Sequence, residues 1–277
     1  DLGCPEETLV RYVEGRREVP VWAEYRAPGG PDTPPWKENG VYLVTGGAGA
    51  LAHAVAREIA AQTGNATVIL AGRSPLDPDS LEVSRKPAAV GTVRHERADI
   101  SSPSETDALI ARILERHGAI DGVIHAAGAA DGALIVDTSD RGFRDGLAAT
   151  AAGVVNLDAA TRSLPLDFFV TFSSPCGEDG GVGRVDGAAA HAFLNAYTRY
   201  RRDLVAQGER FGHSQSVLWP LGDEGPTDPE TGDLHRILSS GHSRVRVPAP
   251  PADRPRGKTP GPTQRKLPAF STDGTDS

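Results

Sequence analysis

Short runs of β-branched and aromatic residues alternate along the chain with stretches in which apolar residues recur at helical spacing. A short apolar run bounded by turn residues predicts a strand that is buried on both faces, and helical spacing predicts a helix with one buried face. The expected strands lie at residues 41–44, 67–71, 92–100, 122–128 (with its turn), 167–174 and 214–220. The expected helices lie at residues 51–63, 103–117, 140–162 and 186–207.

The order of these elements predicts the fold class. Buried strands that alternate with helices form parallel sheets, because each helix carries the chain back to the start of the next strand. We therefore expect an α/β fold, a Rossmann-like doubly wound parallel sheet with helices on both faces, preceded by a short β-hairpin. Residues 75–91 are rich in Pro and Ser and lack periodicity, so the second crossover is expected to be short or irregular.

A glycine cluster, Thr45-Gly46-Gly47-Ala48-Gly49, follows the first expected strand. Glycines in such a turn let the backbone approach a pyrophosphate, whose charge the N-terminus of the following helix stabilises. Glycine-rich turns also occur where nothing binds. A cofactor cleft is favoured here because a strand precedes the turn and an Ala-rich helical pattern follows it.

Further candidate residues fall at the same expected edge of the sheet. Ligands of parallel sheets bind beyond the carboxyl ends of the strands, which is where Arg73, Asp99 and the turn at 126–128 fall. In dinucleotide folds an arginine at the end of the second strand favours a 2′-phosphate, so Arg73 favours NADPH over NADH. The alternative is an ordinary solvated surface arginine.

The two ends of the chain differ in composition from its middle. Alternating residues predict a β-hairpin within residues 1–25, and residues 26–39 have the Pro- and Gly-rich composition of a linker. The expected domain spans residues 40–243. Residues 244–277 are rich in Pro, Arg, Gly, Ser and Thr, which predicts a disordered linker or tail. The chain contains no Met, even at its start, so we expect a segment of a longer polypeptide.

Charge and composition narrow the classes of function. The net charge of -8 and the pI of about 5.5 give no electrostatic case for binding nucleic acid or an anionic membrane. No segment has the apolar length of a membrane span or the pattern of a signal peptide, so a cytoplasmic protein is expected. Cys4 and Cys176 lack metal-ligand spacing, so no metal site is expected. A small soluble ligand fits these properties best.

A set of motifs occurs together in a characteristic order and spacing. They are Thr45-Gly46-Gly47-Ala48-Gly49, Gly72-Arg73, Asp99-Ile100-Ser101, residues 122–128, residues 153–158, Phe172-Ser173-Ser174, residues 188–194 and Trp219-Pro220-Leu221. With them the chain resembles a ketoreductase domain of a modular type I polyketide synthase, a branch of the short-chain dehydrogenase/reductases, over residues 40 to about 241. The hairpin is similar to the last strands of the catalytically silent subdomain that precedes such domains.

The resemblance implies a reaction, a cofactor and partners. Such ketoreductases move hydride from NADPH to the β-carbonyl of an acyl chain on an acyl carrier protein. An acyl carrier protein and the neighbouring domains of a multidomain synthase are therefore the implied partners. The implied cofactor-binding residues are Thr45, Gly46, Gly47, Gly49, Arg73, Asp99, Ile100, Ala126, Ala127 and Gly128.

Most catalytic positions of the family are replaced in this sequence. In the family a serine hydrogen-bonds the carbonyl, a tyrosine supplies the proton, and a lysine and an asparagine hold the tyrosine and the cofactor. The serine position matches Ser174. The tyrosine, lysine and asparagine positions fall on Gly187, Thr150 and His191.

These replacements predict a catalytically silent domain that keeps its cofactor cleft and serves as a scaffold in the synthase module. Glycine cannot donate a proton, and a positioned acid typically contributes about 10²–10⁴-fold to a rate. The alternative is an active NADPH-dependent β-ketoacyl reductase whose proton comes from His191 or from a water held by Ser174. His125 is expected to be a packed structural residue and Cys176 an ordinary thiol.

Overall fold

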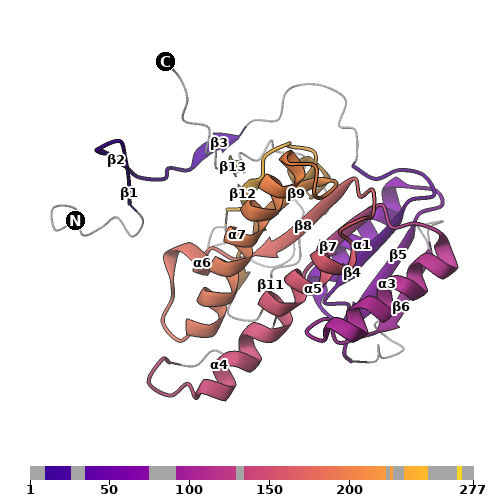
Figure 1. Ribbon diagram of the computed structural model, residues 1–277, viewed down its shortest axis with the longest axis horizontal. Helices are drawn as coiled ribbons and strands as arrows, with labels where there is room; N and C mark the ends of the chain where they lie inside the picture. Colours follow the sequence, from indigo (N-terminus) through magenta and orange to yellow (C-terminus); the bar gives the residue numbers. More distant parts are fainter. Residues whose placement is uncertain are drawn as a thin grey trace, which may run out of the picture.

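A computed structural model describes residues 10–25, 35–74, 92–128, 134–222, 225–226, 234–248 and 267–269, and a large twisted sheet forms its centre (Figure 1). Across this sheet the strands are β3 (Ala23–Tyr25), β13 (Leu267–Ala269), β12 (Arg244–Arg246), β9 (His213–Leu218), β8 (Phe168–Ser173), β7 (Gly122–His125), β4 (Val41–Thr45), β5 (Thr67–Gly72) and β6 (Thr92–Arg97). Among these described strands, all neighbours from β12 to β6 pair in parallel, and β13 pairs antiparallel with both β12 and β3.

The strand order reverses at β4. From β4 the chain builds outward through β5 and β6, returns to β7 on the other side of β4, and continues outward through β8, β9 and β12. The crevice beyond the carboxyl ends of β4 and β7 is therefore the topological switch point of the sheet, which is where ligands of such folds bind.

Helices cover both faces of the sheet (Figure 1). The described helices are α1 (Ala50–Gln62), α3 (Pro103–His117), α4 (Asp140–Leu147), α5 (Gly153–Ala160), α6 (Cys176–Asp179), α7 (Val185–Ala206) and α8 (Leu234–Leu238), with a π-helical turn η1 (Ala148–Ala152) between α4 and α5. Adjacent strand residues point to opposite faces, so Val44 and Leu70 pack with α1 and α8, whereas Leu43 and Ile69 pack with α3, α5 and α7. The predicted doubly wound α/β fold is confirmed.

The N-terminal segment contributes to two sheets. Strands β1 (Arg11–Val13) and β2 (Arg16–Glu18) form an antiparallel hairpin around Glu14 and Gly15, whose φ angles of 49° and 79° suit a tight hairpin turn. The predicted hairpin is therefore confirmed. The next strand, β3, leaves this hairpin and joins the edge of the large sheet through β13.

Two sequence predictions differ from the structure. The helix predicted over residues 140–162 is interrupted by the π-helical turn η1. The tail predicted over residues 244–277 begins too early, because β12 pairs with β9 and its Val245 is fully buried. Apart from β13, the rest of that predicted tail after residue 248 lies outside the described residues.

The end of the predicted linker packs against the domain. The Trp36 side chain is buried, and its ring centroid lies 5.6 Å from those of Tyr42 and Phe168. Lys37 Nζ lies 2.7 Å from a carboxylate oxygen of Asp121, near the amino ends of β4 and β7. The packed unit therefore includes residues before 40, while residues 26–34 lie outside the described part of the chain.

A buried ion pair fixes α5 against α7. The Asp158 carboxylate, on α5, is fully buried and accepts hydrogen bonds from Arg201 Nε at 2.8 Å, Arg210 Nε at 3.1 Å and the Tyr197 hydroxyl at 3.0 Å. A buried carboxylate is tolerated only when it is paired and hydrogen-bonded in this way. The cluster therefore holds together the two helical segments whose N-terminal ends reach the carboxyl edge of the sheet.

Candidate functional site

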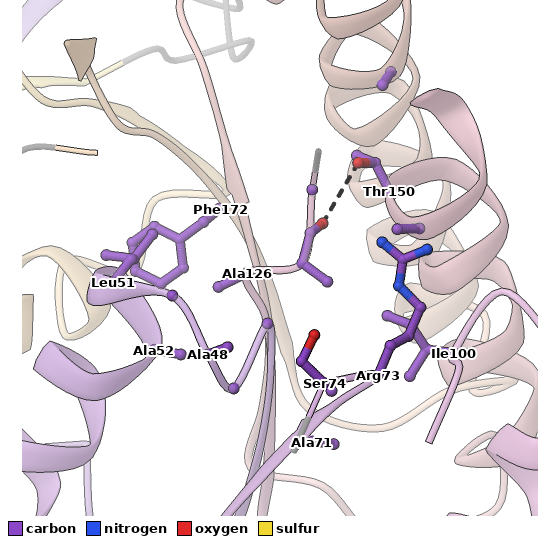
Figure 2. A pocket seen from close by; sticks show the side chains of 18 of the residues that line it. Ala48, Leu51, Ala52, Ala71, Arg73, Ser74, Ile100, Ala126, Thr150 and Phe172 are labelled. Carbon is purple, nitrogen blue, oxygen red and sulfur yellow. Dashed lines mark hydrogen bonds between the residues drawn. The ribbon is translucent and has the colours of Figure 1, made fainter. Parts of the chain in front are cut away.

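A cleft of about 350 Å³ opens at the topological switch point, beyond the carboxyl ends of β4, β5, β7 and β8 (Figure 2). Leu51 and Phe172 lie on one side of it, and Arg73, Ile100 and Thr150 lie on the other. The glycine turn after β4 forms one end of the cleft, and the start of α7 forms the other.

The turn after β4 requires glycine because two neighbouring strands approach its backbone closely. Gly46 has a φ of +83°, and a Cβ at this position would lie 2.6 Å from the carbonyl oxygen of Ala126. The Gly47 N–H donates to the carbonyl oxygen of Ala71 at 3.0 Å. The turn is thus held against the ends of β5 and β7, and its two glycines leave the adjoining part of the cleft free of side chains.

The first turn of α1 presents backbone donors to this end of the cleft. Its N-cap residue is Gly49, which has no side chain to accept a hydrogen bond, and its first turn contains no acidic residue. The first N–H groups of a helix have no intrahelical acceptor, and they lie at the positive end of the helix dipole. Ala48, Gly49, Leu51 and Ala52 line the cleft at this point, so the site fits an anionic group.

Charged groups lie along the wall formed by the ends of β5 and β6. The Arg73 side chain extends beside Ile100, and Ser74 lies next to it (Figure 2). Asp99 accepts hydrogen bonds from the Ser101 hydroxyl at 2.7 Å and from its N–H at 3.0 Å. These bonds, together with the positive charge of Arg73, hold the pKa of Asp99 below its ordinary value. This wall therefore offers a cation and a carboxylate to a ligand.

The opposite end of the cleft lies where β8, η1 and α7 meet. Phe172 and Ser173 come from the end of β8, and Thr150 comes from η1. Gly187 and His191 come from the first turns of α7 and lie on the same side of that helix. Gly187 contributes only backbone atoms, and the Thr150 hydroxyl donates to the carbonyl oxygen of Ala127 at 3.4 Å.

His191 carries the imidazole at this end of the cleft. Burial lowers its pKa to about 4, so the ring is neutral near pH 7. Among the described residues, no group hydrogen-bonds its buried Nδ1. A neutral imidazole is a much weaker acid than an imidazolium, which limits what His191 can donate in a reaction.

A second histidine, His125, connects the strands under the cleft to η1. His125 is fully buried, with Nδ1 2.8 Å from the Thr45 hydroxyl and Nε2 3.0 Å from the carbonyl oxygen of Thr150. Burial lowers the pKa of His125 to about 4, so we assign the neutral ring, which accepts from Thr45 and donates to Thr150. His125 thus ties η1 to β4 and β7, and it is a packed residue as the sequence predicts.

The cleft brings together most of the residues that the sequence singles out. They are Gly46, Gly47, Gly49, Arg73, Asp99, Ile100, Ala126, Ala127, Gly128, Thr150, Gly187 and His191. Two predicted residues do not line it. Thr45 is buried against His125. Ser174 is also buried, and its hydroxyl accepts from the Cys176 N–H at 3.3 Å.

Sequence reasoning did not single out Phe172, Ser173 and Trp219 as individual lining residues. Each one lies at or just beyond the carboxyl end of β8 or β9. Their location at a strand end is the one feature of the sequence that could have identified them, because residues at strand ends near the switch point commonly line the ligand site.

The described lining of the cleft contains no phenol or ammonium group that could donate a proton to a substrate. Neither a tyrosine nor a lysine is among those lining residues. Tyr197 donates to Asp158, Tyr200 is 54% exposed, and Lys37 pairs with Asp121 at the other edge of the sheet. Within the described part of the chain, no three His, Cys, Asp or Glu residues are grouped to hold a metal ion.

Comparison with known families decides the assignment. The family model for the KR domain matches residues 40–220, which is more than half of the chain. The chain belongs to the KR domain family. The polyketide synthase PksN of Bacillus subtilis (strain 168) is 40% identical to it over 228 residues, covering 81% of this chain and 4% of that polypeptide. PksL of the same organism is 39% identical over 233 residues, covering 83% of this chain and 5% of that polypeptide.

Solved structures agree with this assignment. The crystal structure of a ketoreductase domain from the bacillaene assembly line has a TM-score of 0.77 and 34% identity, and the match covers 87% of this chain and 63% of that one. An N-terminal ketoreductase from the macrolactin assembly line has a TM-score of 0.68 and 32% identity, covering 76% of this chain and 44% of that one. The predicted polyketide synthase ketoreductase domain of the short-chain dehydrogenase/reductase superfamily is therefore confirmed.

The close approach at Gly46 makes a prediction for the stability of the KR domain. Gly118→Ala is the matched control, because Gly118 has a φ of +79° and no atom within 4 Å of an added Cβ. Gly118→Ala should lower the free energy of unfolding by about 1 kcal/mol through backbone strain alone. Gly46→Ala adds the clash with Ala126 and should cost roughly 1–3 kcal/mol more. Urea unfolding measures both, and equal losses would contradict the close contact.

The low pKa of His191 makes a prediction for pH dependence. An unfolded histidine titrates near 6.5 and folded His191 near 4, so the unfolded chain binds more protons between these values. The free energy of unfolding of the KR domain should therefore fall as the pH drops from 6.5 to 4. His191→Asn, which cannot titrate, should show a shallower fall in urea unfolding. An NMR titration of the folded His191 ring centred near pH 6.5 would refute the assignment.

Proposed function

We propose that this KR domain keeps a cleft for NADPH but does not catalyse ketoreduction, and that it serves as a structural part of a polyketide synthase module. One observation carries the proposal. None of the described residues that line the cleft is a tyrosine or lysine, and Gly187 and Thr150, to which the family resemblance assigns the proton donor and its cationic partner, are both among them.

The residues at the other end of the cleft fit a dinucleotide phosphate. The side-chain-free turn at Gly46 and Gly47 leaves room for a pyrophosphate, which the N-terminus of α1 would hold. Arg73 and Ser74 would hold the 2′-phosphate, and Asp99 and Ile100 would line the adenine side. When bound there, NADPH supplies a hydride.

The chain's own residues do not complete such a reaction. As hydride adds to a carbonyl carbon, negative charge grows on the oxygen, and a positioned acid must neutralise it. Gly187 has no side chain to do so. The Thr150 side chain is neutral and already donates to Ala127, so it cannot replace an ammonium in a proton relay. The loss of the acid alone removes about 10²–10⁴-fold in rate.

The alternative of an active reductase has less support. It needs a proton from His191 or from a water held by Ser174. The His191 imidazole is neutral near pH 7, because burial lowers its pKa to about 4. Ser174 is buried and does not line the cleft, and its hydroxyl already accepts from Cys176.

The partners in this proposal follow from the relatives. The chain spans about 4–5% of the length of PksN and PksL, which the relatives' names describe as polyketide synthases. We therefore propose neighbouring synthase domains and an acyl carrier protein as its partners. None of the helices in the described ranges is long and apolar enough to cross a bilayer. The cytoplasmic location expected from the sequence stays a prediction.

Cofactor binding is tested by titration of the protein with NADPH and NADH, followed by fluorescence. Arg73→Ala should weaken NADPH binding by about tenfold to a hundredfold, because it removes a charge-assisted contact to the 2′-phosphate. Binding of NADH, which lacks that phosphate, should change little. Arg162→Ala removes an exposed arginine outside the cleft and is the matched control. Equal weakening of both nucleotides would show that Arg73 does not read the phosphate.

Catalytic silence is tested by NADPH oxidation in the presence of a β-ketoacyl thioester. The unmodified domain should stay at background. Gly187→Tyr alone should also stay there, because position 150 still lacks the ammonium that holds the phenol and the cofactor. Turnover by the unmodified domain that is lost in His191→Ala or Ser174→Ala would instead establish the alternative reductase. Turnover that survives both substitutions would contradict both proposals.

A further inference from the structure

Helix α6 packs behind the reactive end of the cleft, against the part of α7 that carries His191. It begins two residues after Ser174, and the N–H groups of Gly177 and Cys176 donate to the Ser174 carbonyl oxygen at 3.1 Å and to its hydroxyl at 3.3 Å. A Cβ at Gly177 would lie 2.7 Å from the backbone N of Ala192, so α6 also touches α7 beside His191. The position of α6 therefore affects both Ser174 and His191.

Two acidic residues of α6 pair with two arginines of β12. Glu178 pairs with Arg244, and both side chains are only 19% exposed. Arg246 Nη2 lies 2.5 Å from Asp179 Oδ2. Since α6 spans a single short turn and none of its residues is fully buried, these ion pairs are its main described polar attachment to the sheet. They join α6 to the last parallel strand.

Trp22, which precedes the residues matched by the KR family model, completes this contact. The guanidinium carbons of Arg244 and Arg246 lie 5.5 and 5.9 Å from the ring centroid of Trp22, within the range of a cation–π contact. Trp22 is half-buried and immediately precedes β3. Burial, and then the neighbouring charge of Arg246, lower the pKa of Arg244 to about 10. Two close guanidinium groups thus depend on the carboxylates and on the ring for compensation.

We propose that Trp22, Arg244, Arg246, Glu178 and Asp179 form a clasp that positions α6 and, through it, the buried Ser174 behind the reactive end of the cleft. The members of this clasp are positioning residues, because none of them lines the cleft itself. The inference goes beyond the proposed function and does not depend on it, since the clasp acts on α6 whether or not NADPH binds. It makes residue 22, far before residue 40 in the sequence, part of the support of the site.

Amide hydrogen exchange of the complete chain without nucleotide tests the clasp. Glu178→Gln removes one charge of the more buried pair and keeps the length of the side chain. Arg244→Met removes the other charge and keeps an unbranched apolar stem. Both should raise exchange within residues 174–184 by about tenfold, because that segment opens more often once its attachment to β12 is lost. Exchange in α1 and α3 should change by less than about twofold. Arg116→Ala, which removes an ion pair with Glu96 at 2.8 Å on the opposite edge of the sheet, is the matched control and should leave residues 174–184 unchanged.

Trp22→Ala tests the part that lies outside the domain. Alone it should raise exchange in residues 174–184, and in the Glu178→Gln background it should add little, because both substitutions act on one contact. Unchanged exchange in residues 174–184 after Glu178→Gln would overturn the clasp. So would an equal increase across α1, α3 and α6, which would indicate only a loss of global stability. Fully additive effects of Trp22→Ala and Glu178→Gln on exchange would show that Trp22 is not part of the clasp.

Discussion

The close approach of a glycine turn to two neighbouring strand ends is the constraint on which the rest of the cleft depends. A side chain at position 46 would overlap the carbonyl group of Ala126, and the Gly47 N–H donates a hydrogen bond to the carbonyl oxygen of Ala71. This contact places the start of α1 over the switch point with its N–H groups uncovered. The geometry that suits a nucleotide phosphate is therefore built mainly from backbone, and it does not depend on the side chains of the reactive end.

The end of the cleft around Thr150, Gly187 and His191 is supported by a different set of interactions. The His125 ring holds η1 through the carbonyl oxygen of Thr150, not through its side chain. The Asp158 and Arg201 pair likewise fixes α5 and α7 well away from Gly187. These supports do not involve the side chains at positions 150 and 187, so the packing of η1, α5 and α7 described here does not depend on the chemistry of those two side chains.

The sequence predicts the sheet, the helix at 103–117 and the glycine turn because each rests on local signals: buried apolar runs, a capped helix start, and glycine after a strand. It misses the π-helical interruption at η1, because hydrophobic periodicity carries no signal of a π-helical turn or of its hydrogen bond with His125, a residue far away in the chain. It misses β12 because this strand is short and carries two arginines, whose charges are compensated by acidic residues of α6 that lie far away in the sequence. It singles out Ser174 where Ser173 lines the cleft, because successive residues at a strand end point to opposite sides.

The most direct test of the central claim is deuteride transfer, measured by mass spectrometry. The complete chain is incubated with NADPH that carries deuterium at the transferable position and with a β-ketoacyl thioester, and the acyl product is then analysed. We expect unreduced β-ketoacyl thioester, even at nucleotide concentrations that saturate the cleft. A deuterated β-hydroxyacyl product, formed at a rate above that of a protein-free control, would contradict the account.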